Sequence, residues 1–313
     1  MRSILVTGGA GFIGSHLGEA LLARGSRLRV LDDFSNGRRF NLPAGDYELM
    51  EGDLRDPDQV ESCMSGVHLV LHQAALVSVP LSIDNPLSCY ETNVQGTLNL
   101  LSAALQNGVD RIVLASSSAV YGQSDRPVAE DGPKAPLSPY AASKLAMEEA
   151  ALMYHRVYGL PVVCLRYFNV YGPRQRPDSP YAAVIPAFIQ SMLAGKPPVI
   201  FGDGNQRRDF VHVADVVRAN LLAAESDSAV GQVLNISGGG AVTINELAEI
   251  LQGFLPDAPA PVHAPPREGD IYFSEAALDR AERALGYRTA VGLEEGLRST
   301  VEWFLQERLK TTP

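Results

Sequence analysis

Tyr140 and Lys144 stand at the two ends of the motif YAASK, four residues apart. Pro139 precedes the tyrosine, and a stretch rich in Ala, Leu, Met and Glu follows, which predicts a helix with both side chains on one face. A free tyrosine has a pKa of about 10, and a nearby ammonium group favours its phenolate form. The pair is therefore a candidate proton-transfer device, although a surface tyrosine beside a solvated lysine gives the same spacing.

A glycine-rich turn lies between the first expected strand and the first expected helix. Residues 3–7 form a short apolar run, typical of a buried parallel strand, and residues 12–24 have a helical pattern. The glycines of GGAGFIG, at 8–14, match the spacing G-x-G-x-x-G. That spacing permits a tight turn and lets a pyrophosphate approach backbone N–H groups closely.

An acidic pair follows the second expected strand where dinucleotide binding requires an acid. Asp32 lies 18 residues after Gly14, and Asp33 follows it. A carboxylate at this distance accepts hydrogen bonds from the adenosine ribose. It also disfavours a 2′-phosphate, so the pattern favours NAD over NADP. Arg38 and Arg39 follow closely and leave NADP open as an alternative.

Three consecutive hydroxyl residues follow another apolar run. Ser116, Ser117 and Ser118 come after residues 112–115, which we expect to form a buried strand. A strand that runs into hydroxyl groups places them at the carboxyl edge of an open α/β sheet, where ligands bind. A polar turn would have the same composition, so the three serines indicate a ligand site only in combination with the glycine-rich turn and the Tyr140–Lys144 pair.

Composition narrows the functional classes. The chain has 313 residues, 46% of them apolar, and a formal net charge of −10. An acidic chain without a basic run is a poor partner for a phosphate backbone, so we expect no nucleic acid partner. Without a long apolar stretch or a leading signal segment, we expect no membrane association and a cytoplasmic protein. The three widely spaced cysteines are expected to be reduced packing groups, and the six histidines form no metal-ligand spacing.

Strand and helix patterns alternate through the first half of the chain. We expect strands at 3–7, 28–31, 47–50, 68–72, 111–116 and 161–167, and helices at 12–24, 57–64, 86–107 and 140–158. This alternation predicts an α/β fold with a Rossmann-like doubly wound parallel sheet. A helix near 209–224 and a strand near 232–237 are expected to return to this domain. The NAD-binding domain would then comprise 1–168 plus 209–238, and a smaller, discontinuous C-terminal substrate domain would comprise 169–208 plus 239–313.

Taken together, the motifs resemble the extended short-chain dehydrogenase/reductase family over essentially the whole chain. The shared motifs, in order, are GGAGFIG, GDLRD, HQAA, SSSAVYG, SPYAASK, RYFNVYG and RDFVHV. Within that family, the chain is most similar to the nucleotide-sugar 4-epimerases. Related dehydratases follow the catalytic hydroxyl residue with Asp-Glu, and related decarboxylases also carry a Glu, whereas Ser118 and Ala119 stand here. Without that carboxylate, the resemblance implies only the groups that oxidise and reduce one carbinol carbon of the sugar.

The resemblance implies catalytic roles for Ser117, Tyr140 and Lys144. Tyr140, as phenolate, would take the proton from the sugar 4-hydroxyl while a hydride passes from C4 to NAD. Ser117 would hydrogen-bond the same oxygen; we select it because its 23-residue spacing to Tyr140 matches this family, and Ser116 and Ser118 remain further candidates. Lys144 would lower the tyrosine pKa and hold the nicotinamide ribose. The 4-keto sugar would then turn over and take the hydride back on its other face, so NAD is regenerated and expected to stay tightly bound.

The resemblance also assigns the remaining contacts. Cofactor contacts fall on Gly8, Gly11, Phe12, Ile13, Gly14, Asp32, Asp33, Asn36, Gly37, Asp53, Leu54, Ala74, Ala75, Asn93, Tyr140, Lys144 and Tyr167. Substrate contacts fall on Ser78, Ser117, Tyr140, Asn169, Ala183, Val184, Arg208, Arg267, Asp270 and Ser274. The two arginines would bind a diphosphate, and Asp270 would bind a uridine ribose.

Ser274 bears on the choice of sugar. In this family the position borders the C2 substituent, and a tyrosine there restricts epimerases to UDP-glucose and UDP-galactose. A small residue leaves room for an N-acetyl group, and Ala183 and residues 74–83 also resemble epimerases acting on UDP-N-acetylglucosamine. A roomy pocket rejects a smaller sugar by only about 1–3 kcal/mol. We therefore expect UDP-GlcNAc and UDP-GalNAc as substrates, with UDP-Glc and UDP-Gal also accepted.

Three alternatives remain open from the sequence. They are an epimerase for UDP-glucose only, an epimerase for UDP-glucuronate, and a non-catalytic NAD-binding protein. A glucuronate carboxylate would need dedicated cations or hydroxyls near residues 78–82, where no basic residue stands. The intact Ser117, Tyr140 and Lys144 argue against a non-catalytic protein. Relatives commonly dimerise through the helices corresponding to 86–107 and 140–158, so we expect a homodimer.

Overall fold

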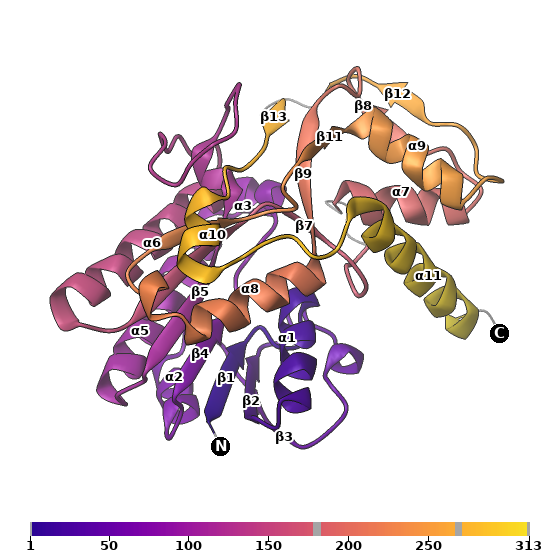
Figure 1. Cartoon of the computed structure of the whole chain (residues 1–313). Coiled ribbons are helices and arrows are strands. Elements are labelled where there is room, and N and C mark those ends of the chain that lie inside the picture. The colour runs from indigo at the N-terminus through magenta and orange to yellow at the C-terminus, as the bar shows by residue number, and fades with distance from the viewer. Residues whose placement is uncertain (1, 178–182, 267–270, 312–313) are drawn as a thin grey trace.

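The computed structural model describes residues 2–177, 183–266 and 271–311. Its centre is a parallel sheet of seven strands in the order β10-β6-β5-β4-β1-β2-β3 (Figure 1). The strands are β1 (Ser3–Thr7), β2 (Arg27–Asp32), β3 (Tyr47–Glu51), β4 (Leu69–His72), β5 (Arg111–Ser117), β6 (Val162–Tyr167) and β10 (Val233–Ile236). This order and direction confirm the predicted Rossmann-like α/β fold.

Helices cover both faces of this sheet. One face carries α1 (Phe12–Ala23) and α8 (Val213–Glu225), and the other carries α2 (Pro57–Met64), α5 (Gly96–Gln106) and α6 (Pro139–Tyr158). Successive strand side chains point to opposite faces, so Val6 packs into the cluster under α1 and α8, while Leu5 packs into the cluster under α2, α5 and α6. Because both faces are covered, the strands read as continuous apolar runs.

The strand order reverses direction between β1 and β4. The chain leaves β1 toward β2 and β3, and it later continues from β4 toward β5, β6 and β10. The connections that follow β1 and β4 therefore diverge at the carboxyl edge, which is where ligands bind in open sheets of this kind. The glycine turn follows β1, and Ala74 and Ala75 follow β4.

A second group of elements lies beyond the carboxyl ends of the seven strands (Figure 1). A four-stranded sheet contains β7 (Asn169–Tyr171), β9 (Arg207–His212), β11 (Ala241–Thr243) and β13 (Phe273–Ser274), and β8 (Val199–Phe201) pairs with β12 (Val262–Ala264). An apolar cluster joins α7 (Val184–Leu193), α9 (Ile244–Phe254) and α11 (Leu293–Thr311). The shorter elements are α3 (Val79–Asp84), α4 (Pro86–Tyr90), α10 (Asp279–Leu285), η1 (Arg39–Asn41), η2 (Glu91–Gln95), η3 (Ser118–Tyr121) and η4 (Asp227–Ala229).

Two expected helices differ from the structure. The helix expected at 209–224 begins only at Val213, because residues 209–212 belong to β9, which pairs with three strands of the second sheet. The expected helix at 86–107 is divided into α4, a π-helical segment at η2, and α5. The return of α8 and β10 to the first sheet is confirmed, while the residue boundaries of the two domains stay predictions.

The three cysteines are free and buried, as expected for packing groups. None of the helices in the described ranges combines the length and apolar character needed to cross a bilayer.

Candidate active site

The three predicted catalytic residues lie where the end of β5 meets the start of α6. Ser117 is the last residue of β5, and Tyr140 lies in the first turn of α6. The side chain of Ser117 lies near enough to the Tyr140 hydroxyl to lower its pKa as a hydrogen-bonding partner. One turn further along α6, the Lys144 ammonium donates to the Ala115 carbonyl over 2.9 Å and is only 2% exposed. The structure therefore brings the three side chains together.

Burial dominates the proton affinities of this pair. It raises the pKa of Tyr140, and the hydrogen bond from Ser117 opposes part of that rise. Burial also lowers the pKa of Lys144 to about 8, against the opposing charges of Cys89 and Glu148. In the protein alone, burial is the largest influence on the pKa of Tyr140, and the expected lowering of that pKa by Lys144 stays a prediction. The two pKa values therefore lie further apart than in the free side chains, and the lysine becomes the more readily deprotonated of the two groups.

The backbone of Tyr140 is held on both sides by serine hydroxyls. The Ser82 hydroxyl accepts from the Tyr140 N–H over 3.0 Å, and the Ser143 hydroxyl donates to the Tyr140 carbonyl over 2.7 Å. The Asn93 amide donates in turn to Ser143 over 2.9 Å. The sequence reasoning missed Ser82 because 58 residues separate it from Tyr140. Ser143 lies within the YAASK motif itself, and its i, i+3 spacing from the tyrosine is the signal that could have found it.

The glycine turn has the geometry that a pyrophosphate requires. Gly8 has a φ of +68°, and a Cβ at Gly14 would lie 2.1 Å from the Gly8 carbonyl oxygen. The turn can therefore pack this tightly only without side chains. Gly11 is the N-cap of α1 and carries no side-chain acceptor, so the first N–H groups of the helix are available to an anion. These residues fit the pyrophosphate of a dinucleotide.

Asp32 ties the glycine turn to the end of β2. Its carboxylate is 6% exposed and accepts from the N–H groups of Ala10 (2.8 Å) and Phe34 (2.9 Å). Burial raises the pKa of Asp32, and these two hydrogen bonds oppose the rise. A Cβ at Gly37 would lie 2.7 Å from a carboxylate oxygen of Asp32, which accounts for a glycine there. Each carboxylate oxygen has a second lone pair for a ribose hydroxyl.

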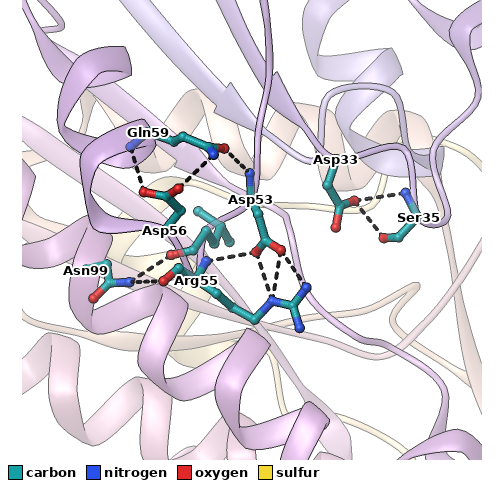
Figure 2. Close-up of polar contacts among 8 residues, drawn as sticks. Asp33, Ser35, Asp53, Arg55, Asp56, Gln59 and Asn99 are labelled. Carbon is teal, nitrogen blue, oxygen red and sulfur yellow. Dashed lines mark hydrogen bonds and ion pairs between the residues drawn. The ribbon is translucent and has the colours of Figure 1, made fainter.

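Figure 2 shows the acids at the end of the sheet where the adenosine half of a dinucleotide would lie. Asp33 is exposed and accepts from the N–H and hydroxyl of Ser35, and Asp53 accepts from the Arg55 guanidinium over 2.9 Å. The Arg55 hydrogen bond lowers the pKa of Asp53. Arg39 is ion-paired with Glu51. Because these two arginines are already engaged by carboxylates, this edge favours a ribose diol over a 2′-phosphate.

The other predicted cofactor residues lie around the same edge. Ala74 donates through its N–H to the Thr7 hydroxyl, and the Asn93 side chain contacts both the N–H and the carbonyl of Leu76. The Tyr167 hydroxyl accepts from Asn220 over 2.7 Å. Phe12 and Ile13 begin α1, Asn36 and Gly37 follow β2, Leu54 follows β3, and Ala75 follows β4. Their individual contacts with a cofactor stay predictions.

Three of the described substrate residues lie on the second sheet. Ser274 pairs in register with Arg208, and the Asn169 amide donates to the carbonyl of Asp209, the residue after Arg208, over 3.0 Å. Three neighbouring strands thus carry Asn169, Arg208 and Ser274, and Asn169 is in register with Phe210, two residues after Arg208. Ser78 is the N-cap of α3, and Ala183 is the N-cap of α7, directly before Val184. Arg267 and Asp270 lie outside the described residues.

Comparison with known proteins places this geometry in a family. Residues 4–237 match the NAD dependent epimerase/dehydratase family. A putative UDP-glucose 4-epimerase of Methanocaldococcus jannaschii is 42% identical over 306 residues, which cover 96% of this chain and 97% of that protein. The chain therefore belongs to the NAD dependent epimerase/dehydratase family, and the predicted cofactor, NAD, is confirmed at the level of this family.

Two solved structures refine the comparison. The UDP-N-acetylglucosamine 4-epimerase from Methanobrevibacter ruminantium, in complex with UDP-N-acetylmuramic acid, superposes with a TM-score of 0.94 at 40% identity, covering 98% of this chain and 99% of that one. The UDP-glucose 4-epimerase of Thermotoga maritima with UDP-glucose superposes with a TM-score of 0.95 at 38% identity, covering 98% and 100%. Both neighbours are 4-epimerases, and they are named for different sugars.

Proposed function

We propose that this protein is an NAD-dependent UDP-sugar 4-epimerase that interconverts UDP-GlcNAc and UDP-GalNAc and also accepts UDP-Glc and UDP-Gal. The observation that carries the proposal is the contact of Tyr140 with Ser117, with Lys144 one turn away, at the carboxyl edge of the sheet. Ser118 and Ala119 follow in η3 and provide no carboxylate beside the reacting carbon. The relatives named as 4-epimerases support the same reaction.

The chain's own residues supply the proton chemistry. Tyr140 removes the proton from the sugar 4-hydroxyl, and Ser117, which lies beside the Tyr140 hydroxyl, holds the same oxygen and shortens the path of the proton. Lys144 holds a positive charge one turn below, which stabilises the phenolate. When bound, NAD would supply the hydride acceptor for the oxidation and the hydride donor for the reduction.

The substrate region has to hold the nucleotide while the sugar turns. Arg208 lies on β9 next to Ser274 on β13, so a cation for the diphosphate and a small residue for the sugar come from neighbouring strands. Arg267 and Asp270 are proposed to complete the diphosphate and uridine contacts. Anchoring through the diphosphate leaves the 4-keto sugar free to present its other face to the same hydride.

The preference for the N-acetylated sugar rests on the small side chain of Ser274. This residue is half-buried on the two-residue strand β13. A hydroxymethyl group there leaves room beside C2 that a tyrosine would fill. The solved neighbour named for UDP-N-acetylglucosamine supports this preference, and the neighbour named for UDP-glucose supports acceptance of the smaller sugar.

The test is an NMR time course of the purified protein with each sugar nucleotide in a separate tube and no added NAD. We expect UDP-GalNAc to form from UDP-GlcNAc and UDP-Gal from UDP-Glc, because the cofactor is regenerated in each cycle. Conversion of UDP-Glc alone would support 4-epimerisation and refute the proposed preference for the N-acetylated sugar. Inactivity on both, persisting after NAD addition while UDP-glucuronate is epimerised, would replace the proposed substrate class.

A further inference from the structure

Three consecutive residues at the end of β5 each contact a residue of α6, and the three helix residues are spaced four apart. The pairs are Ser117 with Tyr140, Ala115 with Lys144, and Ser116 with Glu148. Four-residue spacing places all three helix side chains on one face. The first two pairs belong to the proposed proton-transfer site. The third pair, in which the Ser116 hydroxyl donates to the Glu148 carboxylate, takes no part in the proton transfer itself.

Glu148 also forms an ion pair that is buried on all sides. Its carboxylate accepts from Arg166 at two points, Nε to Oε1 over 2.8 Å and Nη2 to Oε2 over 2.6 Å, and the two side chains are 1% and 2% exposed. The remaining guanidinium nitrogen donates to the Tyr121 hydroxyl over 2.8 Å and to the Glu130 carbonyl over 3.1 Å. The network is thus well satisfied, and it links α6 to β6 and to the segment after β5.

A buried ion pair is weak support for stability as such. Taking two charges out of water is costly, and well-packed apolar residues of similar volume are often at least as stable. Arg166 and Ser116 are paired in register on the neighbouring strands β6 and β5, and both reach the same carboxylate. Glu148 is therefore held by two strands at once. A contact of this kind fixes the rotation and the height of α6 on the sheet more narrowly than apolar packing does.

We propose that Glu148 and Arg166 are positioning residues for the C4 oxidation and reduction, which hold α6 on β5 so that Tyr140 stays within reach of Ser117 and Lys144 stays beneath it. This inference rests on the proposed function. Glu148 has a second effect through its charge, because it follows Lys144 by one turn and favours the protonated lysine. Cys89 from α4 also favours the protonated lysine, and burial together with the lysine charge lowers the pKa of His72 on β4.

Three variants separate position from charge. Glu148→Gln keeps the shape and removes the negative charge. Glu148→Met combined with Arg166→Met removes both charges and leaves the local net charge unchanged. Ser116→Ala removes only the contact from β5. The matched control is Thr300→Val, which removes another fully buried hydroxyl, one that donates to the Gly296 carbonyl in α11 far along the chain.

We expect the double Met variant to fold and to retain NAD, while kcat falls by about tenfold or more with little change in KM, because small displacements of reacting groups are costly. Ser116→Ala should lower kcat by about tenfold, and Thr300→Val should leave it unchanged. In Glu148→Gln, the kcat–pH profile should shift to lower pH by about one unit, because removing a negative charge lowers the proton affinity of the groups near it. The double variant should not show that shift.

Ultraviolet difference titration of each form against the same form carrying Tyr140→Phe measures the ionisation of Tyr140 beside Lys144, and it needs no sugar. A wild type that converts no UDP-sugar would defeat the proposed function, and this titration would still test the network. Full kcat in the folded double variant would overturn the positioning role, and if that variant does not fold, full kcat in Ser116→Ala would do so. An unshifted titration in Glu148→Gln would overturn the effect of charge.

Discussion

At the scale of single residues, Tyr140 combines a reactive hydroxyl with a backbone held by its neighbours. Its side chain contacts Ser117, and its N–H and carbonyl are held by Ser82 and Ser143. Tyr140→Phe removes the hydroxyl and leaves the ring and the backbone contacts. We expect kcat to fall by about 10²–10⁴-fold while NAD stays bound, as measured by the NMR assay and by the cofactor released on denaturation. Unchanged turnover would exclude Tyr140 as the base, and loss of NAD would assign it to cofactor binding.

Ser274 carries the second prediction at this scale. In the proposed assignment, a tyrosine in its place would fill the space beside C2, since Ser274 on β13 pairs in register with Arg208 on β9. We expect Ser274→Tyr to lose turnover of UDP-GlcNAc and to keep turnover of UDP-Glc, with Ser274→Ala as the control that retains both. Parallel NMR time courses measure the ratio. Unchanged conversion of UDP-GlcNAc by Ser274→Tyr would remove this residue from sugar selection.

The chemistry-bearing residues could be found from sequence, and their supports could not. Tyr140 and Lys144 are visible because their motif is local and a helix fixes their spacing, whereas Ser117 is separated from Ser116 and Ser118 only by the resemblance to the family. Ser82 and Arg166 act through contacts that join segments far apart in the chain, and a serine or arginine alone has no local signal for such a contact. The net pKa of Tyr140 also depends on its burial, which spacing does not reveal.

At the scale of elements, the start of α6 is capped by two serines of different origin. The Ser138 hydroxyl accepts from the Ala141 N–H over 3.1 Å as the local N-cap, whereas the Ser82 hydroxyl reaches the Tyr140 N–H from α3. Ser138→Ala and Ser82→Ala should each reduce the free energy of unfolding by about 1 kcal/mol. Only Ser82→Ala should also lower kcat strongly, because it frees the backbone of Tyr140 itself.

Chemical denaturation and the NMR assay measure the two effects on the same samples. Equal kcat in the two serine variants would mean that Ser82 is a structural cap without influence on catalysis. A Ser82→Thr variant, which retains the hydroxyl, should recover most of the lost turnover if the hydrogen bond is the cause.

Local patterns predicted most elements of the first sheet and failed where a contact from outside decided the conformation. Residues 209–212 look like the start of a helix, yet they form β9 because three short strands pair with them. The helix expected at 86–107 contains a π-helical segment in which Asn93 turns inward to the Leu76 backbone and Ser143. π-Helical turns are common at functional sites, and apolar periodicity alone does not reveal them.

At the scale of the whole molecule, the sequence determines the seven-stranded sheet better than the second one. The strands of the first sheet are four to seven residues long and alternate with helices, so each has its own signal. In the second sheet, β13 has two residues and pairs with β9, which lies more than sixty residues earlier in the chain. The predicted substrate residues Asn169, Arg208 and Ser274 lie on short strands that are far apart in the chain. Local sequence patterns therefore do not reveal that these strands are neighbours.

The apolar surface of α4 and α6 leads to a prediction about assembly. Leu87 on α4 is 79% exposed, and Val157 and Tyr158 at the end of α6 are 63% and 54% exposed. Exposed apolar groups on adjacent helices are better buried against a second copy, so we expect a homodimer in solution. Leu87→Ser combined with Val157→Ser should shift the protein toward monomer in sedimentation experiments. Val262→Ser, at a 45% exposed valine on β12, is the matched control that should leave the assembly unchanged.

A wild type that sediments as a monomer at all concentrations would contradict the prediction. A dimer that persists in the double variant would place the interface on another surface. Because α6 carries Tyr140 and Lys144, a dimer formed on this helix would also connect assembly to catalysis, and the monomeric variant should then lose kcat along with its partner.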